Sequence, residues 1–297
     1  MEQVSFTYQP IAREAAANEQ LAQQGYTIFP LLQKKELDKL SDLYFEFQKE
    51  APAYFYSSSH SSDHGFRRRT SDFIKDTLAP LLPQHLKNYK LLGGAYVVKP
   101  PHGKGLLQPH QDWNLVDESQ FRSYNIWIPL VDVRPENGAV FALNGSHSKL
   151  STYRGPGIAS VFKNVEALAW QHMQPLNMKA GEALLYDHAL LHGSPANQSD
   201  TIRLGIVAGI IPEQADMQLH FAGNGAIDVH HCSEDFFLSA DPSKGPGTLA
   251  KKGSVDRIPA ALNETDFRRL YLGEKIHTPA PAQKSFFSRM LSKLTRS

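Results

Sequence analysis

The sequence predicts a mainly β protein with flanking α-helices, built as a sandwich or a jelly-roll barrel. From about residue 90 to residue 212, short apolar and β-branched runs alternate with turn-forming segments rich in Pro, Asn, Gly and Ser. Many short strands at near-regular spacing are typical of these folds. A chain of 297 residues is long enough for one such domain with a sizeable core.

The N-terminal part, residues 10–50, predicts helix, strand, helix. The run AREAAANEQLAQQG contains strong helix formers and ends at Gly25, a residue type that often terminates helices. YTIFPLL, at 26–32, is β-branched and aromatic, which indicates a strand. The following KKELDKLSDLYFEFQKEA has its leucines at helical spacing.

Residues 51–75 lose this periodicity and gather Ser, Gly and charge, so we expect a loop or lid here. Loops of this length are often functional. The segment contains the basic cluster FRRRTSDF, with Arg67, Arg68 and Arg69. These arginines are either a solvated charge run or a clamp for an anionic substrate, such as a carboxylate, a phosphate or a coenzyme A thioester.

The β core, residues 90–212, has five clear strand candidates. They are LLGGAYVVKP, SYNIWIPLVDV, GAVFALNGS, QPLNMKAGEALLYD and TIRLGIVAGIIP. Residues 1–272 are therefore expected to form a single domain. After it, residues 273–297 read as a TPAPA linker and a basic amphipathic tail, either a packed or frayed helix or a peripheral membrane anchor.

Composition excludes several classes of protein. Lysine plus arginine (31) nearly balances aspartate plus glutamate (30), so no nucleic-acid partner is indicated. The single cysteine, Cys232, excludes an internal disulfide and a four-thiolate zinc site, and it suits a reducing compartment. The N-terminus lacks a signal-peptide pattern and no run approaches 18 apolar residues, so we expect a cytoplasmic protein.

Candidate metal ligands occur in two segments. QPHQDW places His110 and Asp112 two positions apart, where a strand would point both side chains to the same face. LLYDHALLHGSPANQSDTIR supplies a third candidate, His192 or His188. Two histidines and one carboxylate on one face of a metal are typical of non-haem Fe(II) enzymes that activate oxygen.

An alternative is a zinc hydrolase that uses His188 and His192 at i and i+4 of a helix. The sequence has no glutamate after the first histidine, and Gly193, Ser194 and Pro195 would break such a helix at once. His192, at the end of an apolar run and beside a turn, therefore suits a ligand at the rim of a barrel.

Arg203 lies in the apolar run TIRLGIVAGII, eleven residues after His192. If its side chain points inward, the guanidinium needs an anionic partner, and it can bind a carboxylate through two parallel hydrogen bonds. We therefore expect Arg203 to hold a small acid.

Together, QPHQDWNLVDE, YNIWIPLVDVRPENGAVFALNGSHSK and LLYDHALLHGSPANQSDTIRLGI resemble the phytanoyl-CoA dioxygenase family of Fe(II)- and 2-oxoglutarate-dependent oxygenases. QGYTIFPLLQKKELDKL is similar to the N-terminal entry of that family, so the resemblance covers roughly residues 20–212. One departure is Asn144, where the family usually has a proline in a turn.

The resemblance implies a double-stranded β-helix, a cupin-like jelly roll, with the metal inside one end. His110, Asp112 and His192 would bind Fe(II), and Arg203 would hold the distal carboxylate of 2-oxoglutarate. Ser194 and Trp127 match positions that often line the 2-oxoglutarate pocket; as alternatives, Ser194 is a turn hydroxyl and Trp127 is barrel core.

The resemblance further implies a dioxygenase that uses Fe(II), 2-oxoglutarate and O2 to hydroxylate an unactivated carbon of a small or medium organic acid or lipid-related metabolite, releasing succinate and CO2. Because Asp112 is present, hydroxylation is favoured over halogenation. Desaturation, cyclisation or epimerisation on the same scaffold, and a non-catalytic metal-binding module, are the alternatives.

Overall fold

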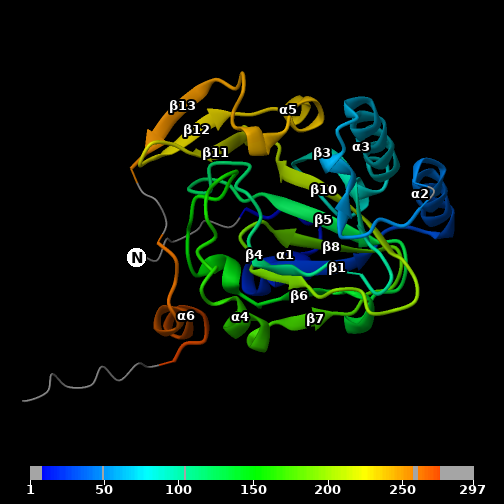
Figure 1. Cartoon of the computed structure of the whole chain (residues 1–297), viewed down its shortest axis with the longest axis horizontal. Coiled ribbons are helices and arrows are strands. Elements are labelled where there is room, and N and C mark those ends of the chain that lie inside the picture. Colours follow the sequence, from blue (N-terminus) through cyan, green and yellow to red (C-terminus); the bar gives the residue numbers. More distant parts are fainter. Residues whose placement is uncertain (1–8, 49, 104, 257–259, 275–297) are drawn as a thin grey trace, which may run out of the picture.

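Two antiparallel sheets form the core of the protein in the computed structural model, which describes residues 9–48, 50–103, 105–256 and 260–274 (Figure 1). The larger sheet comprises β1 (Tyr26–Pro30), β8 (Glu182–Asp187), β5 (Tyr124–Pro129), β10 (Arg203–Pro212), β3 (Tyr89–Lys99) and β2 (Tyr56–Ser57), in that order. The smaller sheet comprises β4 (Leu107–His110), β9 (His192–Ser194), β6 (Val140–Ala142) and β7 (Gln174–Leu176). The predicted jelly-roll fold is confirmed.

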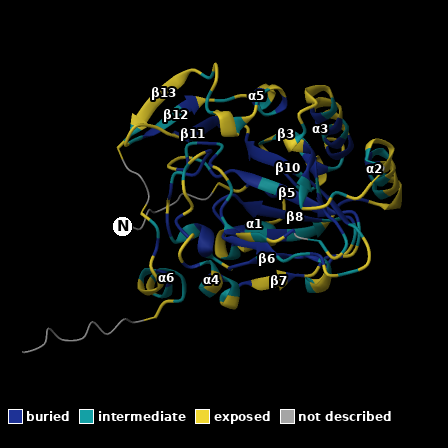
Figure 2. Cartoon of the chain, in the orientation of Figure 1, coloured by how far each residue is buried: buried dark blue, intermediate teal, exposed yellow. Residues whose placement is uncertain are grey.

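The central strand β10 is apolar along most of its length because both faces of the larger sheet are covered. Ile206 and Ile210 pack with the helices on the outer face, whereas Trp127 and Leu184 on neighbouring strands belong to a second core toward the smaller sheet. Figure 2 shows these strands almost entirely buried. The two sheets therefore enclose an interior in which polar side chains are exceptions.

The predicted N-terminal arrangement of helix, strand and helix is confirmed. α1 (Ala15–Gln24) and α2 (Lys34–Phe47) flank β1, and Leu21 and Leu40 lie in the outer core. Gly25 ends α1 with a φ of 89°, where a Cβ atom would lie 2.7 Å from His147 Nδ1. Only glycine combines this left-handed backbone with so close an approach.

The loop predicted for residues 51–75 is wrong from residue 64 onward. After β2 and a 3-10 turn, η1 (Ser58–His60), the chain forms α3 (His64–Leu78), capped by Asp63, whose side chain accepts a hydrogen bond from the Phe66 backbone N–H. The helix was not evident because it buries small polar side chains such as Thr70 and Ser71 against β3.

Another sheet, which the sequence did not reveal, lies beside the jelly roll (Figure 1). It contains β11 (Gln218–Ala222), β12 (Ile227–His231) and β13 (Lys251–Val255), and the short helix α5 (Glu234–Ser239) follows β12. The remaining elements are α4 (Glu166–His172), α6 (Glu264–Tyr271), η2 (Leu82–Gln84), η3 (Pro135–Asn137), η4 (Ser146–Ser148) and η5 (Pro242–Lys244).

The expected basic tail lies outside the described residues from residue 275 onward. Among the helices of the described ranges, none has the length and apolar character that crossing a bilayer requires.

Candidate functional site

The three predicted metal ligands meet between β4 and β9. His110 and His192 are cross-strand partners with ring centroids 4.4 Å apart, and Asp112 follows β4 in the chain. Asp112 Oδ1 lies 3.6 Å from His110 Nε2, and Asp112 Oδ2 lies 3.8 Å from His192 Nε2. One donor atom from each residue lies within 4.8 Å of the others, so a single ion could contact all three.

Both histidines are held in the tautomer that a metal needs. His110 Nδ1 lies 2.7 Å from the Gln108 carbonyl oxygen, and His192 Nδ1 lies 3.0 Å from that of Leu190. Because a carbonyl oxygen only accepts, each Nδ1 carries the proton and each Nε2 presents its lone pair to the centre. Two imidazole nitrogens and a carboxylate fit a divalent transition metal such as Fe(II).

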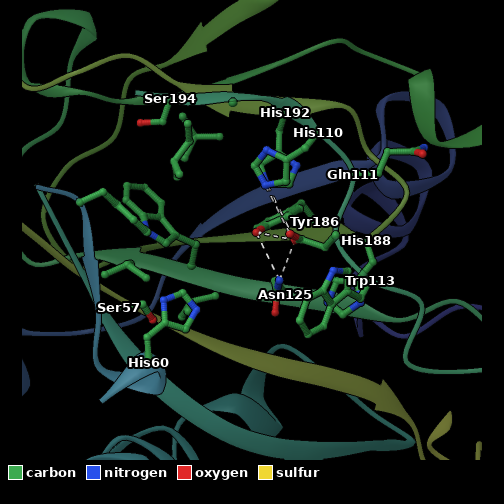
Figure 3. A pocket seen from close by; sticks show the side chains of 18 of the residues that line it. Ser57, His60, His110, Gln111, Trp113, Asn125, Tyr186, His188, His192 and Ser194 are labelled. Atoms are coloured by element: carbon green, nitrogen blue, oxygen red, sulfur yellow. Dashed lines mark hydrogen bonds and ion pairs between the residues drawn. The ribbon is translucent and has the colours of Figure 1, made fainter. Parts of the chain in front are cut away.

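Two further side chains orient the carboxylate of Asp112. Asn125 Nδ2 and the Tyr186 hydroxyl donate to Asp112 Oδ2 at 2.8 and 3.0 Å (Figure 3). Asn125 and Tyr186 are cross-strand partners on β5 and β8, so the larger sheet supports a ligand of the smaller one. Neither residue was predicted from the sequence, although a polar Asn125 inside the apolar run SYNIWIP was a usable signal.

The charges of Asp112 and His192 favour metal binding, whereas His110 must lose a proton first. Burial lowers the pKa of His110, but Asp112 and the Gln108 carbonyl outweigh it and raise the pKa. Burial alone would raise the pKa of Asp112, but His192 and His110 outweigh it and hold the pKa well below its usual range. Burial lowers the pKa of His192 to about 4, despite the opposing effect of Asp112. Near neutral pH, Asp112 is therefore an anion and His192 is uncharged, as metal ligation requires.

The three candidate ligands face a cavity of about 460 Å³ between the two sheets (Figure 3). Its wall also includes Arg203, Trp127 and Ser194, so the structure brings all six residues expected at the metal and 2-oxoglutarate sites to one cavity. The wall further includes Leu115, Asn125, Tyr186, His188, Val207 and Phe237.

Arg203 is the unusual charge in this cavity. Arg203 is 2% exposed, and its guanidinium carbon lies 5.4 Å from the centre of the Trp127 ring. Within the described ranges, no carboxylate lies within the 4.0 Å of an ion pair with Arg203, and its Nε has no hydrogen-bond partner. Burial lowers the pKa of Arg203 to about 9, which means that the buried cation is destabilised, so the site favours an anion that stabilises it.

A buried lysine supports the same corner of the cavity. Lys99, the cross-strand partner of Arg203, donates from Nζ to the carbonyl oxygens of Gly105, Ser194 and Pro195. It therefore fixes the chain where β9 ends, two residues after His192. The Ser194 hydroxyl donates to the Gly138 carbonyl oxygen at 2.8 Å, which leaves its oxygen able to accept.

The three arginines of the basic cluster lie on α3, away from the metal ligands. Arg68 forms an ion pair with Asp235 at the surface, and Arg69 lies over the Phe47 ring. Arg67 is buried and lines a second cavity. The structure therefore separates Arg67 from its two neighbours.

The helical zinc pair of the alternative prediction is not formed. His188 lies in a turn and His192 begins β9, so the two residues do not share a helical face. His188 lines the cavity, and its Nδ1 lies 2.9 Å from Ser123 Oγ, but it does not belong to the group of three potential ligands found in the described residues.

Comparison with known proteins agrees with this geometry. The mouse Phytanoyl-CoA dioxygenase domain-containing protein 1 is 32% identical over 117 residues, covering 36% of this chain and 40% of that protein. "Dioxygenase trt7" from Aspergillus terreus is 30% identical over 130 residues, or 41% of each chain. The matched region thus spans less than half the length of these relatives.

Among solved structures, the non-heme alpha ketoglutarate dependent carbocyclase SnoK from nogalamycin biosynthesis shares the fold, with a TM-score of 0.53 and 16% identity over 69% of this chain and 86% of that chain. The profile of Phytanoyl-CoA dioxygenase (PhyH) matches residues 14–205, which include the His110, Asp112 and His192 centre and Arg203. The chain therefore belongs to the phytanoyl-CoA dioxygenase family.

Proposed function

We propose that the protein is an Fe(II)- and 2-oxoglutarate-dependent dioxygenase that hydroxylates an unactivated carbon of a small or medium organic acid or lipid-related metabolite. The observation that carries the proposal is the presence of the buried, unpaired Arg203 in the same cavity as His110, Asp112 and His192. A metal centre alone would suit many reactions, whereas a metal centre with a carboxylate receptor suits a keto-acid cosubstrate.

In this proposal, each residue has a definite task. His110 Nε2, Asp112 and His192 Nε2 hold the iron, and Arg203 binds the distal carboxylate of 2-oxoglutarate. Trp127, whose ring centre lies 5.4 Å from the guanidinium carbon, would help to position Arg203. The bound iron and cosubstrate supply the oxidising power, because O2 is consumed, 2-oxoglutarate becomes succinate and CO2, and a substrate C–H becomes C–OH.

The proposal also names the type of oxidation, which is hydroxylation. Asp112 occupies the position that halogenating relatives leave to chloride, which favours hydroxylation. SnoK, described as a carbocyclase, shares only the fold with this chain. Because a fold does not fix the reaction, desaturation, cyclisation and epimerisation are the alternative outcomes.

The test is a turnover assay with Fe(II), 2-oxoglutarate, O2 and a library of carboxylic acids and lipid-related metabolites. We expect succinate to form in proportion to a product that is heavier than its substrate by one oxygen atom. A product that has lost two hydrogens would indicate desaturation or cyclisation instead. Absence of succinate with every compound, from protein that has bound iron, would support the non-catalytic module.

A further inference from the structure

The cavity at the metal site adjoins a second cavity of about 200 Å³ beneath α3 and α5. Four residues line both spaces: Leu115, Asn125, Val207 and Phe237. Asn125 also donates to Asp112, so the second cavity begins beside the carboxylate of the metal centre. A molecule with one carbon at the metal could therefore place its remaining atoms in this space.

The wall of the second cavity is mostly apolar, and the part of it formed by strands consists of small residues. β3 and β10 contribute Gly93, Gly94, Ala95, Ala208 and Gly209, and bulkier apolar side chains come from Leu92, Met217 and Leu238. A space with such walls favours the hydrocarbon part of a ligand.

The cation of this wall is Arg67, which is only 5% exposed and lies there with the polar residues Ser59, Ser71, Asn125 and Glu234. Its Nη1 donates to the carbonyl oxygens of Phe237 (3.1 Å) and Ala240 (2.6 Å), and its Nε has no acceptor. Among the residues that the structure describes, no carboxylate lies within ion-pair distance of Arg67, and the exposed Asp241 senses its charge only through space.

The other charge at this cavity is already neutralised. Glu234 is held by Lys75, with Nζ to carboxylate distances of 2.8 and 2.9 Å. Arg67 therefore brings a net positive charge to the cavity wall, and a buried cation without a counter-charge is costly until an anion arrives.

We propose, resting on the oxygenase function above, that the second cavity binds the far end of the substrate, and that this end is an alkyl chain terminating in a carboxylate that pairs with Arg67. Each of the two buried arginines then binds a different acid of the reaction: Arg203 binds 2-oxoglutarate, and Arg67 binds the substrate. The substrate class is an aliphatic carboxylic acid, oxidised at a carbon remote from its carboxylate.

The direct test is isothermal titration of the metal-free protein with hexanoate, heptanoate, octanoate and octan-1-ol. We expect the affinity of the acids to rise roughly fourfold with each added methylene until the cavity is full. Octanoate should bind about tenfold more tightly than octan-1-ol, because only the acid forms a charge-assisted pair with Arg67.

Three arginine variants locate the carboxylate. Arg67→Gln should lower octanoate affinity about tenfold, to the level of the alcohol. Arg68→Gln is the matched control, because its side chain lies on the same helix but pairs with Asp235 outside both cavities. Arg203→Gln should retain octanoate binding, which separates the proposed site from the 2-oxoglutarate site.

Arg67→Gln also removes two hydrogen bonds to the end of α5 and could loosen that helix. Met217→Trp therefore tests the pocket in a second way that leaves these bonds in place. Filling the second cavity from this half-buried position should weaken octanoate far more than hexanoate, with the guanidinium intact. The proposal is overturned if the octanoate affinity is unchanged in both Arg67→Gln and Met217→Trp. It is also overturned if Arg203→Gln abolishes octanoate binding. Because these titrations contain no metal, failure of 2-oxoglutarate turnover would overturn the proposed function separately.

Discussion

At the scale of single residues, the site depends on polar groups that are buried without an internal partner. Arg203 shows this most clearly. It lies in the apolar strand β10 with its guanidinium near the Trp127 ring, and no carboxylate among the described residues pairs with it. Burying a charge in this way destabilises the empty protein, and binding of an anion reverses the cost. We therefore expect Arg203 to act by binding a ligand and not by stabilising the fold.

Arg203 should set both the strength and the pH dependence of 2-oxoglutarate binding. Since its pKa is lowered to about 9, the free protein keeps the charge below that pH and loses it above. The Kd for 2-oxoglutarate should therefore rise as the pH increases through 9. Arg203→Gln should raise the Kd about ten- to a hundredfold, corresponding to about 1.5–3 kcal/mol, and remove this pH dependence.

Arg134→Gln provides the control for that experiment, because Arg134 is exposed and lies outside the cavity. It should bind 2-oxoglutarate as the parent protein does at every pH. Equal affinities for the Arg203→Gln variant and the parent would show that the cosubstrate carboxylate is held elsewhere.

At the scale of elements, the metal centre is shared between the two sheets. β4 and β9 of the smaller sheet carry His110 and His192, while β5 and β8 of the larger sheet carry the two groups that hold Asp112. The carboxylate thus depends on the packing of one sheet against the other. Groups that orient a ligand typically affect metal affinity by 10- to 100-fold.

Tyr186→Phe should therefore weaken Fe(II) binding by about tenfold without emptying the site. The substitution removes the hydroxyl that donates to Asp112 Oδ2 but keeps the ring, whose centroid lies 4.8 Å from that of His192. The measurement is a competitive metal titration, with Tyr89→Phe as a control at the far end of β3. An unchanged affinity in Tyr186→Phe would mean that Asn125 alone orients the carboxylate.

At the scale of the whole molecule, the sequence predicted those features of the fold and the site that depend on the spacing of neighbouring residues. Short strands and turns predicted a sandwich or a jelly roll, and the family resemblance implied the jelly roll. His110 and Asp112 followed from their two-residue spacing, and Arg203 from a charge inside an apolar run. The parts that were missed depend on contacts between distant segments. α3 forms where Gly93 and Gly94 of β3 make room for it, since a Cβ on Gly93 would lie 2.2 Å from Ser71 Oγ.

The same limit applies to the sites. No local pattern could indicate that Asn125 and Tyr186 converge on one carboxylate oxygen, or that Arg67 turns inward while its neighbour Arg68 stays at the surface. Those arrangements arise only when the two sheets and α5 are in place. The basic cluster was therefore visible in the sequence, but its division into one buried and two surface residues was not.

The measurement that tests the central claim most directly is the visible spectrum of the protein titrated anaerobically with Fe(II) and 2-oxoglutarate. A cosubstrate chelated to iron in this site should give a weak charge-transfer band in the parent protein and in Asp200→Ala, whose side chain is 93% exposed. Asp112→Ala should lose the band. A parent protein that shows no band but binds zinc tightly, or a band that survives in Asp112→Ala, would contradict the account.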